Sequence, residues 1–431
     1  MSPDSAHNAN SRLVKTFGSP NDTSKPVKLD INVQELSVPL VDSSGFSSSE
    51  GVVEYWDELG DLLGHGDPKT NQGHLLEVSD HSESLTFEIV PYDIASWKRE
   101  LLLHYSDSIA GDMICIDGRH NGWRYILLPM ALSDDLVMNA VLTTSAFHLA
   151  TRKTSLSTWN GTAEMSLGEC QAADYSFPEL LYRRTIRSLK ERRDVVSGDD
   201  EANKSVLMAI LVLLSAVQVN GGDEFPTLYA MMRALVDVLG GENRLCGSDL
   251  GDFMIRQMRK MRVYAAPLLS EDAGCGTFSS PDNWNQIFEC LQFCSRQKPE
   301  HATCTALVAD MLQQAHDIYL SEASHDPSMP HSFQLFEDSI CRLNRFRRSF
   351  EDFPDDAPGK HALVWPTFIA ASCSILDEHK EFFKAALLRF HSRSRFNNIL
   401  RGLEHLQYLW DRRNQGERWT QLLAQSRFFM A

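Results

Sequence analysis

The sequence predicts an all-α fold, a multi-helix array that begins near residue 87. From there on, apolar residues recur three and four positions apart, and the apolar–polar alternation of strands is almost absent. Short polar links separate these amphipathic stretches, a pattern typical of helical arrays. With 431 residues, of which 43% are hydrophobic, the chain is long and apolar enough to bury a sizeable core.

Residues 1–86 are expected to form a disordered, acidic and Ser-rich segment in front of an all-helical domain over 87–431. The segment carries 14 Asp and Glu against 5 Lys and Arg, which accounts for −9 of the net charge of −17. Within it, residues 52–63 (VVEYWDELGDLL) mix carboxylates with aromatic and aliphatic side chains. Such a stretch can fold on a partner, although docking of a short helix on its own domain is the simpler interpretation.

Charge, cysteine content and the lack of a targeting signal predict a soluble intracellular protein that contacts no membrane. The first residues lack the basic and apolar regions of a secretory signal, and the longest apolar run, 206–219, is too short to span a bilayer. The nine scattered cysteines fit reduced thiols. Because carboxylates are in excess, any contact with DNA must be local or made through a partner.

The stretch 123–150 predicts the central core helix. Ser133 suits an N-cap, and the two carboxylates after it suit the positive end of the helix dipole. Apolar or small side chains then recur at helical spacing: Leu136, Val137, Ala140, Val141, Thr144 and Phe147. Asn139 and His148 are the polar exceptions, and a His on a buried helix is more often a hydrogen-bonded core residue than a ligand.

Helices are predicted on both sides of this core helix. The stretch 94–108 precedes it, and 177–193 follows it with four aliphatic side chains facing inward: Leu180, Leu181, Ile186 and Leu189. Pro226 suits the start of the helix 225–239, and the glycine pair 240–241 suits its end. Further helices, besides the buried run 206–219, are expected at 250–266, 283–296, 302–321, 332–350, 362–375, 378–390, 397–412 and 417–426.

Two local signals refine this helical pattern. Asp377 stands directly before the helix 378–390 and suits its N-cap. The stretch 272–280 contains two glycines and predicts the clearest interior break, which allows a two-lobed helical body.

No catalytic residue or cofactor site is predicted, and we expect a protein that is not an enzyme. The sequence contains no G-x-S-x-G, H-E-x-x-H, Walker A, C-x-x-C or G-x-G-x-x-G motif. The best metal candidate is the set Cys290, Cys294, His301 and Cys304. Simple packing of small cysteine side chains is the stronger interpretation, since an i,i+4 pair of cysteines is not a standard zinc motif, and we expect no metal there.

Two basic clusters are present, at residues 183–193 and 342–348. The first lies on the polar face of an amphipathic helix, so a solvated face is the default interpretation. The second, RLNRFRR, is denser and is the better candidate for a nuclear import signal or a phosphate contact.

Three stretches together resemble a known family, the fungal-specific transcription factor domain of zinc-cluster regulators. Residues 101–150 contain W-R-x-x-x-L-P-x-A, followed by the core helix, and residues 188–240 resemble the family's middle region. Residues 361–423 contain L-x-W-P-x-F-I-A, then N-x-x-x-x-L-x-x-L-x-x-x-W, then W-x-x-L-L. The resemblance covers most of the chain after residue 100, in order and at similar spacing.

The chain departs from that family at its N-terminal end. Family members usually carry six cysteines there, which bind two zinc ions and place a short helix in the major groove. Here no cysteine precedes Cys115, so this zinc cluster cannot form from the printed sequence. Either the DNA-binding zinc cluster has been lost and a partner protein supplies one, or the printed sequence omits this part.

The resemblance implies a nuclear transcriptional regulator that controls a pathway-specific gene set, for example for secondary metabolism or nutrient use. The alternative is an interaction protein that binds no DNA and pairs with an intact zinc-cluster factor. The expected partners are proteins of the transcription machinery or another zinc-cluster factor, in homo- or heterodimers. Direct DNA binding and a small effector ligand stay open.

Overall fold

The computed structural model describes residues 94–159, 176–192, 200–325, 333–413 and 417–430, and all regular elements in these ranges are helical. The all-α prediction is therefore confirmed. Residues 1–86, with the acidic stretch 52–63, lie outside the described residues, as does the boundary at residue 87.

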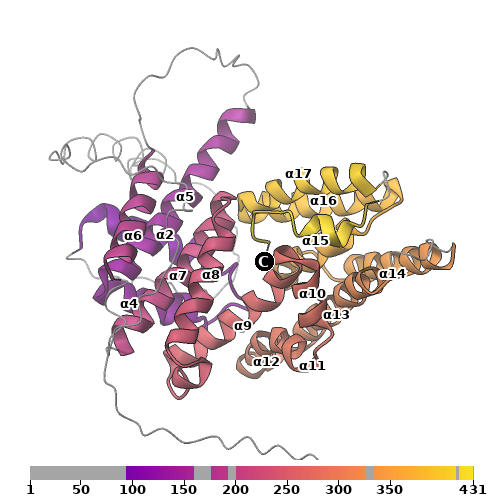
Figure 1. The fold of residues 1–431 in the computed structure, drawn as a ribbon. Helices are drawn as coiled ribbons and strands as arrows, with labels where there is room; N and C mark the ends of the chain where they lie inside the picture. Colours follow the sequence, from indigo (N-terminus) through magenta and orange to yellow (C-terminus); the bar gives the residue numbers. More distant parts are fainter. Residues whose placement is uncertain (1–93, 160–175, 193–199, 326–332, 414–416, 431) are drawn as a thin grey trace, which may run out of the picture.

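The helices follow one another along the chain in two halves (Figure 1). The first half consists of α2 (Ser96–Ser108), α3 (Gly122–Tyr125), α4 (Leu127–Ser133), α5 (Asp135–Trp159), α6 (Phe177–Arg192), α7 (Asp200–Asn220), α8 (Phe225–Val238) and α9 (Asp249–Leu269). The second half consists of α10 (Glu271–Phe278), α11 (Pro281–Trp284), α12 (Phe288–Gln297), α13 (Ala302–Ala323), α14 (Phe333–Asp352), α15 (Val364–Ser372), α16 (Asp377–Ser394), α17 (Asn397–Arg413) and α18 (Trp419–Leu423). Short 3-10 turns lie at Glu242–Arg244, Asn285–Ile287, Pro299–His301 and Lys360–Leu363.

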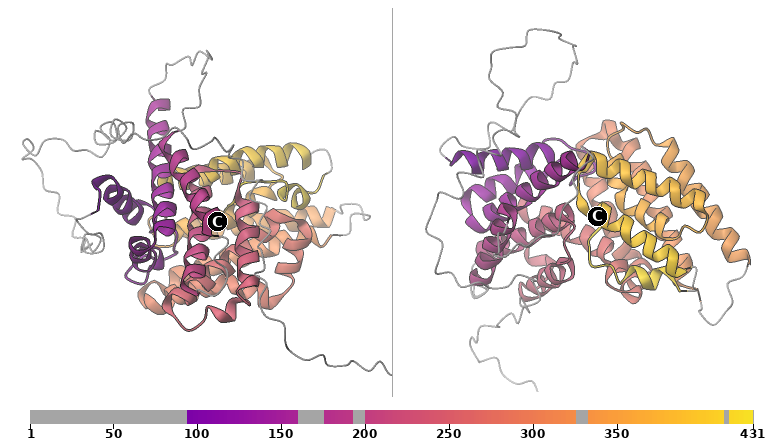
Figure 2. Two further views of the ribbon diagram at one scale, coloured as in Figure 1. Left: turned by 60° about the vertical axis from the view of Figure 1, so that its left-hand side comes forward. Right: turned by 90° about the horizontal axis from the view of Figure 1, so that it is seen from above.

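The two halves lie side by side (Figure 2). They share one continuous hydrophobic core. Helix α7 packs against α5 and α8 in the first half and against α17 in the second half. Helix α9 runs from the first half toward the second and contacts α7, α10 and α12. The core therefore does not divide into two lobes.

Helix α7 is the buried centre of the first half. Every side chain from Leu207 to Val219 is buried, because this stretch carries hardly any polar group that would need water. Of the described helices, α7 is the one that is long and apolar enough to cross a membrane, yet most of its apolar stretch is buried inside the protein. Burial of this kind is typical of the core helix of a globular fold.

The start of α5 differs from the prediction by one residue. The carboxylate of Asp134, not the hydroxyl of Ser133, accepts the hydrogen bonds of the amides of Leu136 (2.8 Å) and Val137 (3.1 Å). Ser133 instead ends the preceding helix α4, where its hydroxyl donates to the carbonyl of Met130 (3.0 Å). The helices α4 and α5 thus meet at Asp134, which has the extended backbone of an N-cap.

The predicted break at 272–280 is wrong, because α10 occupies most of it. Its N-terminus is capped by Ser270, whose hydroxyl accepts a hydrogen bond from the amide of Ala273 (3.0 Å). Gly274 serves packing here, since a Cβ at this position would lie 2.3 Å from the hydroxyl of Tyr319. A glycine that permits close helix contact has the same sequence signature as a glycine that ends a helix.

Other boundaries were also misplaced. The expected helix 283–296 is split into α11, a 3-10 turn and α12, and the expected helix 362–375 begins as a 3-10 turn before α15. Asp377 is the first residue of α16 rather than its N-cap, and its carboxylate pairs with Lys380 at 3.1 Å. The N-cap residue of α16 is Leu376, which makes no side-chain capping bond.

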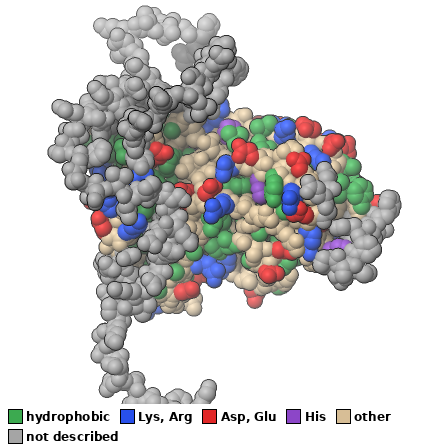
Figure 3. All heavy atoms as spheres, turned by 45° about the horizontal axis from the view of Figure 1, so that its top comes forward, with side chains coloured by type: hydrophobic (Ala, Val, Ile, Leu, Met, Phe, Trp, Pro, Cys, Tyr) green, Lys and Arg blue, Asp and Glu red, His purple; other side chains and the backbone are tan. Residues whose placement is uncertain are grey.

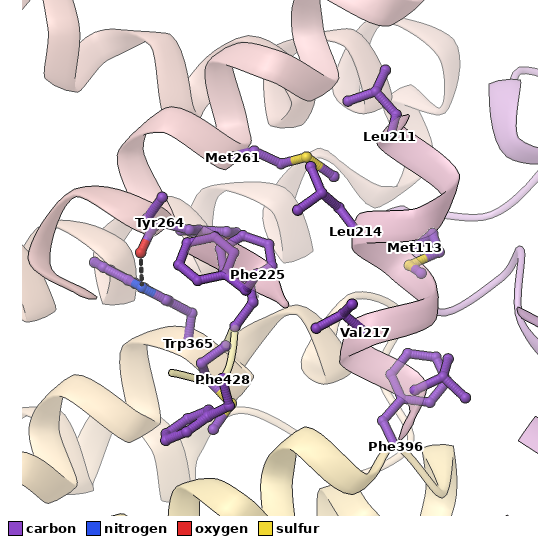
Figure 4. Packing of buried hydrophobic residues seen from close by; sticks show 14 of the residues in the cluster. Met113, Leu211, Leu214, Val217, Phe225, Met261, Tyr264, Trp365, Phe396 and Phe428 are labelled. Atoms are coloured by element: carbon purple, nitrogen blue, oxygen red, sulfur yellow. Dashed lines mark hydrogen bonds between the residues drawn. The ribbon is translucent and has the colours of Figure 1, made fainter. Parts of the chain in front are cut away.

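Aromatic side chains of α9 and α15 meet in the core (Figure 4). The ring of Trp365 is fully buried, stacks on Tyr264 at 5.0 Å and donates its indole N–H to the Tyr264 carbonyl (3.3 Å). Phe147, which we expected in the same core, is only half-buried and packs at the edge of the cluster against Tyr182. Near the C-terminus, Phe429 stacks on Phe225 with 4.5 Å between ring centroids.

Candidate functional site: two adjoining cavities

The most site-like feature is a cavity of about 70 Å³, which we call the Cys290 cavity. Its walls come from the loop 112–122 after α2, from α9 and α12, and from parts of α13 and the turn before α15. About one probe sphere, roughly 10–15 Å³, suffices for one water molecule, so this space fits several waters or one small ligand.

One face of α9 supplies the central wall of the Cys290 cavity. Phe253, Gln257, Lys260 and Tyr264 all line it, and their spacing of four, three and four residues places them on one stripe of the helix. Phe253 and Tyr264 are aromatic and buried, whereas Gln257 and Lys260 bring polar groups into the same stripe. The helix thus presents apolar and polar surface together to the cavity.

Two cations of α9 line this cavity without a carboxylate partner among the described residues. The guanidinium of Arg256 lies 4.0 Å above the ring of Phe293, and the ammonium of Lys260 donates to the carbonyl of Met113 (3.3 Å). Both contacts leave N–H donors free. Arg259, by contrast, faces away and binds Glu242 and Glu289.

Two acceptors near the cavity are buried and unsatisfied. Gln257 is 6% exposed; its amide nitrogen lies 4.0 Å from the Cys290 sulfur, and its Oε1 has no partner. His361 Nε2 lies 2.8 Å from the carbonyl of Ile114, so Nε2 carries the proton and Nδ1 is an acceptor without a partner. Burial lowers the pKa of His361, which favours this neutral ring.

A second cavity of about 50 Å³, the Asn398 cavity, adjoins the first. The two share four wall residues: Asp112, Met113, Lys260 and His361. Asn398 donates to the carbonyl of Phe429 (2.9 Å), while its Oδ1 has no partner. Helices α7, α16 and α17 supply most of the remaining wall, so this cavity lies where the two halves meet.

The charged residues around the two cavities are mainly cationic. Arg256, Lys260 and Arg393 stand against Asp112, whose carboxylate lies 3.8 Å from Arg393. The local balance is +2 in a chain of net charge −17. A confined cationic wall raises the local concentration of anions, so the arrangement favours an anionic ligand.

The four residues considered as metal ligands, Cys290, Cys294, His301 and Cys304, do not form a candidate metal site among the described residues. Cys290 and Cys294 line the first cavity, but no group of three or more His, Cys, Asp and Glu among the described residues is arranged to hold a metal ion, and His301 and Cys304 take no part in one. The thiol of Cys290 donates to the Arg256 carbonyl (3.6 Å). Burial raises the pKa of both Cys290 and Cys294, which keeps the thiols protonated and unreactive.

His148 is a hydrogen-bonded core residue, as predicted. Its Nε2 lies 2.8 Å from the Ser394 carbonyl, and its Nδ1 lies 2.8 Å from Nε2 of His104. Because a carbonyl can only accept, Nε2 of His148 carries the proton and Nδ1 accepts from His104. The pair ties α2, α5 and the end of α16 together.

The basic clusters behave mainly as solvated helix faces. On α6, Arg184 and Arg187 are exposed opposite the buried Leu181, although Leu180, expected inward, is 42% exposed. On α14, Arg345 pairs with Asp310 at 3.5 Å, and Arg347 pairs with Glu351 at 3.1 Å. Basic and acidic side chains are interspersed on the face shown in Figure 3.

Sequence reasoning missed the cavity residues Gln257, Lys260 and Asn398. The available signal was the stripe on α9, where two polar residues interrupt an otherwise aromatic face at helical spacing. Asn398 stood in the N-x-x-x-x-L motif, but nothing in the sequence placed it next to α7 or α9. Long-range packing decides which helices meet.

The fold defines an all-helical domain with small internal cavities, a class that hosts binding, regulatory and catalytic functions alike, so the fold alone assigns none. Comparison with known proteins narrows the class. The family model of the fungal specific transcription factor domain matches residues 100–259 and 283–430. The chain therefore belongs to this family. No curated protein and no solved structure matches it.

Proposed function

We propose that this protein is a nuclear transcriptional regulator that controls a pathway-specific gene set, such as genes of secondary metabolism or nutrient use. The family match over two long blocks of the helical domain carries the proposal, since the family is one of transcription factor domains. The family is regulatory rather than enzymatic, which agrees with the lack of common catalytic motifs in the sequence.

The helical domain is the regulatory part in this proposal. Its core is continuous across both matched blocks, so a ligand or partner that binds one half can affect the other. The chain carries a net charge of −17, and basic and acidic side chains are interspersed on the face shown in Figure 3. We therefore propose that a partner protein, in a homo- or heterodimer, contributes to the contact with promoters.

A second candidate is an interaction protein that never reaches DNA and acts by pairing with an intact zinc-cluster factor. The net charge of −17 favours it, because attraction to DNA phosphates requires a clustered basic surface. The two candidates differ in whether the chain is found on promoters.

The test combines promoter occupancy with DNA binding in solution. Chromatin immunoprecipitation of the tagged full chain should enrich a limited set of promoters, and deletion of the gene should change transcripts from those promoters. Purified chain should bind labelled promoter fragments with sequence preference only when cell extract is added, across a salt series.

Each outcome separates the candidates. If deletion of the gene changes no transcripts, the proposal of a transcriptional regulator is contradicted, whether or not the chain is enriched on promoters. No enrichment together with recovery of a zinc-cluster protein bound to the tagged chain supports the interaction protein. Sequence-preferring binding by the purified chain alone would contradict the assignment of DNA contact to a partner.

A further inference from the structure

The Cys290 cavity combines features of a site for a particular kind of small molecule. Protein interiors rarely leave polar atoms unsatisfied, yet Gln257 Oε1 and His361 Nδ1 are both buried and without a partner at this cavity. Gln257 itself is more than nine-tenths buried. A donor group inside the cavity would satisfy such acceptors.

The same cavity offers unneutralised positive charge. Arg256 and Lys260 line it and form no ion pair within the described part of the chain, while nearby Arg259 and Arg262 are both paired with Glu242. Asp112 also lines the cavity, but Arg393 at 3.8 Å offsets its charge. The cavity therefore suits a ligand with one negative group and one hydrogen-bond donor.

Apolar surface and size restrict the ligand further. Phe253 and Tyr264 form a buried aromatic wall, and Phe293 is held in place by the guanidinium of Arg256. An engineered apolar cavity of about 150 Å³ holds benzene, so a cavity of about 70 Å³ fits only a few non-hydrogen atoms. Large or extended ligands are too big for it.

We propose that the Cys290 cavity binds a small carboxylate with a hydrogen-bond donor on the neighbouring carbon, of which a 2-hydroxy acid is the simplest form. The carboxylate lies against Lys260 and Arg256, the hydroxyl donates to Gln257 Oε1, and a short alkyl group packs on Phe253. This site goes beyond the proposed function, because it concerns binding by the purified chain and stands whether or not the chain reaches promoters.

The first test uses wild-type full-length chain and three matched probes. Lactate carries both the carboxylate and the hydroxyl, propionate lacks the hydroxyl, and lactamide lacks the charge. Isothermal titration calorimetry should show saturable binding of lactate. Propionate and lactamide should each bind at least about fivefold more weakly, since a buried polar or charged group then loses its partner.

The second test assigns the two contacts. Lys260→Met keeps the side-chain stem, removes the charge and should weaken lactate binding about tenfold or more. Gln257→Met should remove the preference for lactate over propionate. Lys384→Met, on the exposed face of α16, is the control and should bind lactate as the wild type does.

The proposal is overturned if lactate does not bind, or if propionate and lactamide bind as tightly as lactate. It is also overturned if chloride binds as tightly as lactate. These probe comparisons use only the wild-type chain, so they decide the matter even if a variant fails to fold. A chain that binds lactate but occupies no promoter would support this site and contradict the regulator, which keeps the two failures apart.

Discussion

The buried histidine pair predicts how stability depends on pH. His104 donates through Nε2 to His148, and His148 donates through Nε2 to the Ser394 carbonyl. Both residues are less than a tenth exposed. Burial, followed by the proximity of His148, lowers the pKa of His104 from 6.5 to about 3. The folded protein therefore keeps His104 neutral in a range of pH in which the unfolded chain binds a proton.

The sign and size of the change in stability with pH follow from proton linkage. Above pH 6.5 both states are neutral at His104 and the pair adds no pH dependence; below it the unfolded state binds more protons, so stability falls as the pH falls toward about 3. Each pH unit below 6.5 in this window lowers the free energy of unfolding by about 1.4 kcal/mol. At pH 5, 1.5 units below 6.5, the loss from His104 is about 2 kcal/mol.

The perturbation that isolates this effect is His104→Gln, which keeps a donor near Nε2 and removes the titration. Urea unfolding between pH 7.5 and 4.5 should show a shallower decline in the variant, with its loss between pH 7 and pH 5 smaller by about 2 kcal/mol. Val137→Ala, on the same helix α5 as His148, is the control: it should lower stability at every pH and keep the wild-type slope. Equal slopes in wild type and His104→Gln would refute the reasoning.

Three further predictions concern packing and capping, and each is checked by urea unfolding at pH 7. Trp365→Ala should cost about 3–5 kcal/mol because the ring is fully buried, whereas Phe147→Ala should cost clearly less because its ring is half-buried; equal losses would contradict these placements. Gly122→Ala places a Cβ 2.3 Å from the ring of Phe253 and should cost about 1–3 kcal/mol, and an unchanged midpoint would show that the ring can move freely. Asp134→Ala removes the cap of α5 and should lower the free energy of unfolding by about 0.5–2 kcal/mol. An unchanged free energy would show that the cap does not stabilise α5.

Helix existence could be predicted from local periodicity, whereas helix ends and close contacts could not. The buried run that became α7 and the helix starting at Phe225 were both placed well, since each carries its own signal in sequence. Gly274 was misinterpreted as a break. A side chain at this position would collide with Tyr319, which lies 45 residues further along the chain. Local sequence cannot distinguish a glycine that ends a helix from one that lets another side chain approach.

The candidate site could be predicted even less. The polar interruptions at Gln257 and Lys260 are visible in the sequence, but their meaning depends on the loop 112–122 and on α12, which reach α9 only in the fold. The cysteines of α12 were noticed for metal chemistry, and the structure shows that they only line the cavity. The sequence thus drew attention to residues of this cavity, but which side chains face it depends on tertiary packing.

The location of the Cys290 cavity gives the proposed ligand a route to regulation. Its walls come from both matched blocks: Gln257 belongs to the first, and Cys290 and His361 belong to the second. A ligand that binds only when both blocks are in place stabilises their contact by RT ln(1 + [L]/Kd), about 2.7 kcal/mol at a hundred times Kd. A change of this size is enough to shift a regulatory domain between two arrangements that differ by a few kcal/mol. The shared wall at Asp112 and Lys260 would pass the effect to the Asn398 cavity, and so to α17 and the C-terminal residues that Asn398 holds.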